Sequence, residues 1–193
     1  MSSAHKKVIV RRFVGDTVPG YLTLSHIVRA QSNPRVIDLL DLSGRILTLP
    51  LSEIKYICYV RDFNLNDPLN PERLTRRTFL ARPRTEGLWL RLTFRGSSPN
   101  PATTTEADIF EGLAPIDLSL ADDLIDDSGI FLIPPDIRSN TQRIYVPRTA
   151  IADLQLIAVI TTPSRKKPLP RSTATPTLQE DLFHNLPPSA RPN

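Results

Sequence analysis

"LTLPLSEIKYICYV" (residues 47–60) and "IYVPRTAIADLQLI" (residues 144–157) carry one pattern at a constant separation of 97 positions, without a gap. Apolar positions answer apolar positions, and Pro50 answers Pro147. A proline has no N–H to give to a β-ladder, so each one marks the end of a strand. Each stretch therefore predicts a strand, a single turn and a second strand, and the chain is expected to build this arrangement twice.

The segment before the first stretch predicts further short strands. Apolar and β-branched runs at 8–10, 20–22, 36–40 and 46–49 are separated by turn residues at Gly15-Asp16 and Ser43-Gly44, and 56–60 closes the set. Ser52 is expected to cap the single turn after Pro50. The first unit is thus predicted over residues 5–63.

The segment before the second stretch repeats this order. "GLWLRLTF" (87–94) alternates apolar and polar residues, and "IFEGLAPIDLSL" (109–120) places Gly112 where the first unit has Gly20. "GIFLIPP" (129–135) and residues 143–160 supply the remaining strands, and the polar residues 96–108 interrupt the first hairpin as an insertion. The second unit is predicted over residues 87–160, after a connector at 64–86.

Strands this short must protect their edges, and closure into a barrel is a common solution. The fold class is therefore predicted as all-β, with two tandem small β-barrel units similar to SH3 and Sm barrels. The first unit resembles the Sm pattern through its early turn, the Gly20-Tyr21-Leu22 triplet and the "VIDLLD" strand (36–41). It departs from that pattern in the Gly-Asp order of its turn and in lacking the Arg-Gly pair that holds an RNA base.

Two units this small bury little surface alone, so they are expected to pack against each other. The sequence leaves open whether they form separate barrels or one merged sheet. The connector contains Phe79 and Leu80 and is expected to lie ordered over both units. Residues 161–193 are rich in Pro, Ser and Thr and are predicted to be a disordered tail.

Composition and charge limit the function classes. The chain has 193 residues, 40% of them hydrophobic, with 7 Gly and 19 Pro, a balance atypical of nucleotide-binding α/β sheets. Of 24 Lys and Arg residues, 14 lie within 1–87, whereas 10 of 20 Asp and Glu residues lie within 88–160. The basic part could meet nucleic acid or the acidic part. A single cysteine and the lack of a long apolar run indicate a cytoplasmic protein.

Four longer motifs resemble an uncharacterised bacterial protein family. They are "YVRDF" (59–63), "RPRTEGLWLRLTFR" (82–95), "EGLAP" (111–115) and "PPDIRSNTQRIYVPRTAI" (134–151). The resemblance implies a shared fold and no known activity. The polar motifs "VRDF" and "SNTQRIYVP" are expected either to hold the two units together or to form a binding surface.

The sequence predicts no metal site, cofactor or catalytic centre. His5, His26 and His184 are scattered, and Cys58 has no Cys or His at ligand spacing. The acidic run at 121–129 does not have EF-hand spacing, so a solvated turn is favoured over a calcium site. No phosphate-binding loop or nucleophile elbow is present, and a non-enzymatic protein is therefore expected.

A non-catalytic interaction or adaptor module is the favoured function, with another protein or a second copy of the chain as partner. The alternative is binding of RNA or single-stranded DNA through the basic first unit, with Tyr21 or Phe79 stacking on bases. A cyclic-dinucleotide receptor is third, since Arg11-Arg12 precedes "DLSG" (41–44). The candidate interaction surface comprises Arg11, Arg12, Arg61, Asp62, Arg73, Arg76, Arg77, Arg82, Arg84, Asn140, Gln142 and Arg143.

Overall fold

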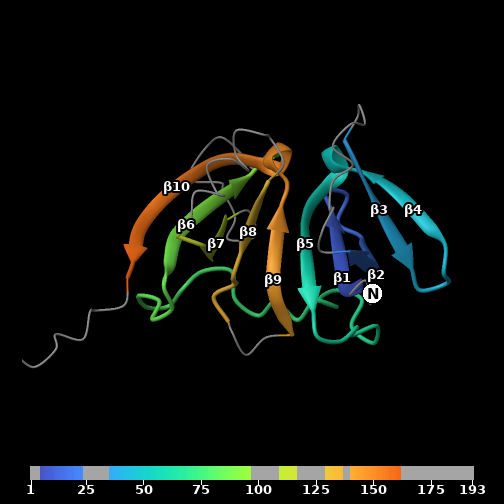
Figure 1. Ribbon diagram of the computed structural model, residues 1–193, viewed down its shortest axis with the longest axis horizontal. Helices are drawn as coiled ribbons and strands as arrows, with labels where there is room; N and C mark the ends of the chain where they lie inside the picture. Colours follow the sequence, from blue (N-terminus) through green and yellow to red (C-terminus); the bar gives the residue numbers. More distant parts are fainter. Residues whose placement is uncertain (1–4, 24–34, 97–108, 117–128, 137–139, 162–193) are drawn as a thin grey trace, which may run out of the picture. The chain divides into compact units, whose positions relative to one another are not determined.

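The computed structural model describes residues 5–23, 35–96, 109–116, 129–136 and 140–161, and Figure 1 shows their strands. All but the first residue of the predicted tail, most of the polar insertion at 96–108 and most of the acidic run at 121–129 lie outside the described residues, as do His26 and His184. In the part of the chain that is described, no helix has the length and apolar character needed to cross a bilayer.

Ten strands and two short 3-10 turns make up the described structure, and the all-β prediction is confirmed. The strands are β1 (His5–Arg12), β2 (Thr17–Thr23), β3 (Val36–Asp41), β4 (Ile46–Pro50), β5 (Ile54–Val60), β6 (Gly87–Phe94), β7 (Ile109–Ala114), β8 (Ile130–Leu132), β9 (Thr141–Val146) and β10 (Ile151–Ile160), with turns η1 (Leu51–Glu53) and η3 (Arg148–Ala150). Both turns follow the prolines that the sequence singled out. The expected cap by Ser52 is wrong, because η1 already begins at Leu51 and no side chain caps it.

The strands form a seven-stranded sheet in the order β4-β3-β2-β1-β5-β9-β8 and a three-stranded sheet in the order β10-β6-β7. All neighbours pair antiparallel. The two sheets meet at Leu113 and Ile133, which exchange backbone hydrogen bonds of 3.0 and 2.9 Å. Through this bridge all ten strands form one hydrogen-bonded succession, with β4 at one end and β10 at the other.

The two halves of this succession have the same internal order. The first half runs β5-β1-β2-β3-β4, and the second runs β10-β6-β7-β8-β9 once the bridge between β7 and β8 is included. Gly20 and Gly112 occupy matching places. A Cβ on Gly20 would lie 2.6 Å from the carbonyl oxygen of Leu40, and one on Gly112 would lie 2.8 Å from the Cβ of Leu132. Both glycines thus allow the second strand of a half to approach the third.

The halves are joined in one sheet, because β5 of the first pairs with β9 of the second. This merged sheet answers the question that the sequence left open. Neither sheet closes on itself among the described residues, so the predicted closure of each unit into a barrel is not observed there. Strand β5 is consequently a central strand that is buried on both faces.

The side chains of β5 alternate between two cores. Tyr56, Cys58 and Val60 pack with residues of β6 to β10, whereas Ile57 and Tyr59 pack with residues of β1 to β3. Burying a large apolar side chain contributes about 1.5–3 kcal/mol. The packing of either half therefore depends on a strand that it shares with the other half.

Candidate functional site

The polar motifs around "VRDF" and "SNTQRIYVP" meet where β5 leaves the sheet and β9 enters it. The backbone N–H of Arg61 donates to the carbonyl oxygen of Asn140 (3.0 Å). The N–H of Asp62 donates to Oδ1 of Asn140 (3.0 Å), and Nδ2 of Asn140 donates to the carbonyl oxygen of Asp62 (2.7 Å). These groups extend the β5–β9 ladder, so they hold the halves together.

The carboxylate of Asp62 takes no part in the hydrogen bonds with Asn140 and instead pairs with Lys7. The distance between Nζ and Oδ1 is 2.7 Å, and both side chains are exposed to solvent. The hydrogen bond from Lys7 lowers the pKa of Asp62. This exposed pair contributes little to stability, since solvent screens it.

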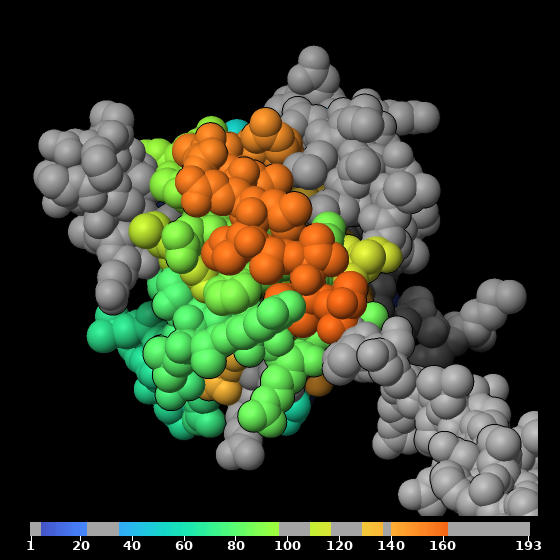
Figure 2. All heavy atoms as spheres, turned by 90° about the vertical axis from the view of Figure 1, so that its left-hand side faces the viewer, coloured from blue at the N-terminus to red at the C-terminus, as the bar shows by residue number. Residues whose placement is uncertain are grey.

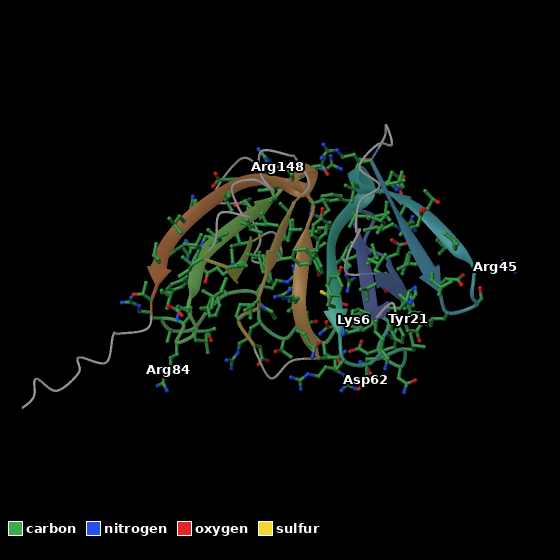
Figure 3. All side chains as sticks on the ribbon, viewed as in Figure 1. Lys6, Tyr21, Arg45, Asp62, Arg84 and Arg148 are labelled. Carbon is green, nitrogen blue, oxygen red and sulfur yellow. The ribbon has the colours of Figure 1, made fainter. Side chains whose placement is uncertain are left out.

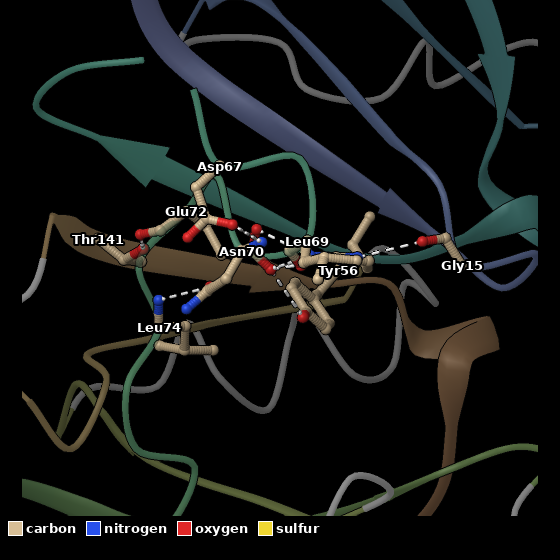
Figure 4. A network of polar contacts seen from close by, with 9 residues as sticks. Gly15, Tyr56, Asp67, Leu69, Asn70, Glu72, Leu74 and Thr141 are labelled. Atoms are coloured by element: carbon tan, nitrogen blue, oxygen red, sulfur yellow. Dashed lines mark hydrogen bonds and ion pairs between the residues drawn. The ribbon is translucent and has the colours of Figure 1, made fainter. Parts of the chain in front are cut away.

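The connector carries a buried carboxylate, Glu72, whose side chain is 2% exposed. Figure 4 shows that it gathers donors from the first half. Nη2 of Arg11 donates to both carboxylate oxygens, at 2.7 and 2.9 Å, and the hydroxyl of Tyr56 donates to Oε1 at 3.2 Å. Thr141 of β9 donates to the backbone carbonyl of Glu72 at 2.8 Å. One connector residue thereby ties β1, β5 and β9 together.

The guanidinium groups of Arg11 and Arg12 are both engaged. Burial opposes the charge of Arg11, but its bonds with Glu72 raise its pKa overall. Arg12 forms ion pairs with Asp16 and with Glu53. The arginine pair that a cyclic-dinucleotide site needs is therefore occupied by carboxylates of the chain itself.

The motif "DLSG" forms a tight turn closed by Asp41. The carboxylate of Asp41 accepts hydrogen bonds from the backbone N–H groups of Ser43 and Arg45 at 2.9 and 2.7 Å, and another from the Ser43 hydroxyl. The bond from Arg45 is the main cause of the lowered pKa of Asp41. These contacts give the motif a local structural role.

A second buried carboxylate, Glu111 on β7, was not anticipated. It accepts two bonds from Arg91 at 2.9 and 2.7 Å, one from the indole of Trp89 at 3.1 Å, and one from the backbone N–H of Phe79 at 2.9 Å. The only sequence signal was an acidic residue within the apolar strand "IFEGLA". Glu72 and Glu111 together fasten the connector to both halves, as expected for an ordered connector.

Two adjoining pockets bring several of the expected basic residues together. The larger, of about 730 Å³, is lined by Leu74, Thr75, Arg76, Arg77, Thr78, Leu80, Arg91 and Ile109. The smaller, of about 380 Å³, includes Arg11, Arg12, Lys55 and Arg77 among its lining residues, together with the carboxylate Glu72. Leu74 and Arg77 belong to both. The two pockets therefore form a basic groove beside the connector.

The remaining expected surface residues lie elsewhere. Nη2 of Arg73 donates to Asn64 at 2.8 Å, Arg143 lies over the ring of Phe131 at 6.0 Å, and Gln142 is exposed on β9. Arg82 and Arg84 are exposed, and Figure 3 shows Arg84 far from Asp62. The twelve residues thus do not form one surface.

The aromatic residues expected to stack on bases face other rings. Tyr21 meets Phe63 edge to face with ring centres 5.4 Å apart, and Phe79 meets Trp89 at 5.5 Å. Each ring thus already has an aromatic neighbour within the chain.

No group of three or more His, Cys, Asp or Glu side chains that could hold a metal occurs among the described residues. Cys58 is fully buried, and burial raises the pKa of its thiol. A buried thiol that stays protonated makes a poor nucleophile.

The outer edge of β10 is an exposed feature that sequence reasoning missed. β10 ends the three-stranded sheet, with β6 on one side, and Figure 2 shows its atoms (orange) at the surface along the strand. Leu156 is 57% exposed, Ile157 38% and Val159 47%. The strand has ten residues, of which Asp153 is the only charged one. Natural edge strands are usually protected against pairing by Lys, Pro or other charged residues, and β10 contains only Asp153 of these kinds.

Comparison with known proteins places the chain in a family. A family model described as "Family of unknown function (DUF6982)" matches residues 4–158. The chain belongs to this family. The matched range spans both halves and the connector, which confirms the expectation of an uncharacterised family, while bacterial origin stays a prediction. No curated protein and no solved structure matched the chain. For this DUF6982 member, functional proposals therefore depend on the geometry described above.

Proposed function

We propose that this protein is a non-catalytic interaction module that binds a protein partner along the outer edge of β10. One observation carries the proposal, namely a ten-residue edge strand with three exposed large apolar side chains and one charge. An unpaired edge offers a row of backbone N–H and C=O groups to an added strand. Its exposed apolar side chains add burial when that strand arrives.

The rest of the fold supports a binding role over a catalytic one. The charged residues with described contacts near the connector are satisfied within the chain: Glu72 by Arg11 and Tyr56, and Glu111 by Arg91. A catalytic group needs a reactive partner close to an open site. The buried carboxylates instead hold the connector against the strands of both halves.

A photo-crosslinking residue placed at Val159 tests the proposal in cells that produce the full chain. We expect one or more defined adducts with protein, because Val159 is 47% exposed on the edge strand. The matched control places the same residue at Leu65, which is 57% exposed on the connector. Adducts at 159 that disappear in a Leu156→Lys background support the proposal. Equal adduct patterns at 159 and 65, or none at 159, would contradict it.

The basic groove supports a second candidate, binding of single-stranded nucleic acid. The larger pocket has three arginines and no acidic residue among its described lining residues, and one of the three, Arg91, is paired with Glu111. Phosphate contacts supply most non-specific affinity, and that affinity falls steeply with salt. Oligo(U) and oligo(dT) carrying a fluorescent label are therefore the appropriate probes, with anisotropy measured across a salt series.

Charge reversals at two matched pairs of arginines distinguish binding in the groove from binding to positive charge elsewhere on the protein. We expect Arg76→Glu with Arg77→Glu to abolish binding at low salt, since both residues line the larger pocket. Arg82→Glu with Arg84→Glu changes net charge equally outside the lining residues and should retain most binding. Equal losses in the two variants, or no binding by the unaltered chain at low salt, would eliminate this candidate.

A further inference from the structure

The two ends of the strand succession correspond to strands that pair with each other inside the chain. By the constant separation of 97 positions, β10 is the counterpart of β5, and β4 is the counterpart of β9. β5 and β9 form the antiparallel pair that joins the halves. Their counterparts β10 and β4 have no strand partner on their outer sides among the described residues. The chain thus contains one joint between halves, the β5–β9 pair, and two strands, β10 and β4, that correspond to the two sides of a second joint.

We propose that β10 of one copy pairs antiparallel with β4 of a second copy, so that copies associate head to tail. This inference rests on the proposed function, because it names the partner of the same β10 edge. Within the chain, the β5–β9 joint shows that the fifth strand of one half accepts the fourth strand of the next. The repeat makes the same geometry available between copies.

The internal joint also supplies the register of the external one. Ile57 lies opposite Tyr145, Cys58 opposite Ile144, and Tyr59 opposite Arg143. Applying the offset of 97 positions places Leu154 opposite Thr48, Gln155 opposite Leu47, and Leu156 opposite Ile46. The last pair matters most, because Leu156 is 57% exposed and Ile46 is 71% exposed. The transferred register thus sets two exposed apolar side chains against each other.

Burial at the internal joint shows what pairing does to such residues. Tyr59 and Val60, which lie in the joint, are 5% and 6% exposed. Their counterparts Leu156 and Ile157 are large apolar residues, yet they are 57% and 38% exposed. Cross-strand contact with a second copy would cover these side chains in the same way.

Both strands are suited to pairing and poorly protected against it. β4 has the sequence ILTLP, with no charged residue before its final proline. In Figure 1, β4 and β10 are the outermost strands on opposite sides, so one copy can use both at once. A symmetric pairing of β10 with β10 would leave two β4 edges uncovered. Head-to-tail pairing uses both edges, and it produces rings if the rotation closes or filaments if it does not.

Sedimentation velocity on the full chain over a wide concentration range tests the proposal with two single-edge variants. Ile46→Lys blocks β4 and Leu156→Lys blocks β10, and both sites are solvent-exposed, so folding should be retained. We expect the unaltered chain to form species larger than a dimer and each variant alone to be monomeric. An equimolar mixture of the two variants retains one intact pair of edges and should form only a 1:1 dimer. Leu65→Lys, on the connector, should behave like the unaltered chain.

Disulfide trapping checks the register. Ile46→Cys mixed with Leu156→Cys should give a cross-linked pair of chains, whereas Thr48→Cys mixed with Leu156→Cys should give much less. Residues directly opposite each other have their Cβ atoms about 4.5–5.5 Å apart, close to the separation of about 3.5–4.5 Å in a disulfide, while diagonal neighbours are farther apart. Cys58 is fully buried and will not compete. Equal trapping at positions 46 and 48 would overturn the register.

The remaining outcomes separate this inference from the proposed function. Self-association of the Ile46→Lys variant with loss of it in Leu156→Lys would mean that β10 pairs with β10, which overturns the head-to-tail contact but leaves β10 as the binding edge. A monomeric unaltered chain that still gives β10-dependent adducts with another protein overturns the inference alone. A monomeric chain without such adducts overturns both.

Discussion

The side-chain amide of Asn140 pairs with both backbone polar groups of Asp62, 78 positions earlier in the chain. The two bonds, of 3.0 and 2.7 Å, follow directly on the backbone pairing of β5 with β9. The side-chain amide of asparagine places an N–H donor and a carbonyl acceptor side by side, as a strand partner does. The joint between the halves is thus extended by a side chain after the strands end.

Replacement of Asn140 by Ala should therefore weaken the joint. We expect a loss of about 1–2 kcal/mol in the free energy of unfolding, since a net hydrogen bond contributes about 0.5–1.5 kcal/mol and two are removed. Urea unfolding followed by circular dichroism measures it. Gln142→Ala, on the exposed surface of β9, is the control and should change stability by less than about 0.5 kcal/mol. Equal losses in the two variants would show that the Asp62 bonds are not responsible.

Removal of the Glu72 carboxylate should cost far more than removal of the Asp62 carboxylate. Glu72→Ala leaves the partly buried Arg11 without its counter-charge and Tyr56 without its acceptor. Breaking a buried pair on one side costs about 3–5 kcal/mol, and we expect the lower end because Arg11 is 16% exposed. Asp62→Ala breaks an exposed pair with Lys7 and should cost below about 1 kcal/mol. Similar values from chemical denaturation would contradict the structural role of Glu72.

Loss of the hydroxyl should affect stability differently at two buried tyrosines on β5. The hydroxyl of Tyr56 donates to Glu72, whereas that of Tyr59 is buried with no hydrogen-bond partner among the described residues. A buried polar group without a partner is unfavourable. Tyr56→Phe should therefore lower the free energy of unfolding by about 1 kcal/mol, and Tyr59→Phe should leave it unchanged or raise it by up to about 1 kcal/mol. Thermal and urea unfolding of both variants measure this difference, and a larger loss in Tyr59→Phe would refute it.

Alkaline pH should destabilise the fold through Cys58. Burial raises the pKa of this thiol above its ordinary value of 9.0, so the thiol ionises in the unfolded chain before it does so in the folded chain. The contribution is complete below pH 9.0 and is lost as pH rises above that value, by up to about 1.4 kcal/mol per pH unit. Burial raises the pKa of Tyr56 and Tyr59 as well, from an ordinary value of 10.0, so the decline should steepen above it.

The Cys58→Ala variant isolates the thiol. Its stability at neutral pH should be lower because a packed group is lost, but its decline just above pH 9.0 should be shallower than that of the unaltered chain. A thiol reagent at pH 8 should react with the unaltered chain only as fast as the fold opens. Rapid labelling of the native protein, or equal pH slopes in the two proteins, would contradict the burial argument.

The parts of the fold that could be predicted are those that depend on the properties of neighbouring residues in the sequence. Apolar and β-branched runs between turn residues placed the strands at 36–40 and 46–49 within a residue of β3 and β4, and the prolines placed both turns. The equivalence of Gly20 and Gly112 was also correct, because only glycine permits the close approach of the third strand at both places.

The candidate site was predicted less well than the fold. Arg76 and Arg77 do line a pocket, but Arg11 and Arg12 are engaged with carboxylates of the chain. Their partner Glu72 lies 61 positions from Arg11, and no periodic pattern links residues so far apart. The exposure of Leu156 could not be predicted either, because the sequence pattern of an apolar strand does not show whether the strand is central or at an edge.

The sequence by itself determined the strands, the turns after Pro50 and Pro147, and the duplication of one strand order, because these depend on backbone geometry and local periodicity. Only the tertiary structure decided that β5 joins β9, since any exposed strand edge can accept any other and the choice follows from packing on both faces. Among the described residues, the same choice leaves β10 and β4 without a paired strand on their outer sides. The first stretch, residues 47–60, ends in β5, which pairs with β9. The matching second stretch, residues 144–157, ends in β10, which has no such partner among the described residues.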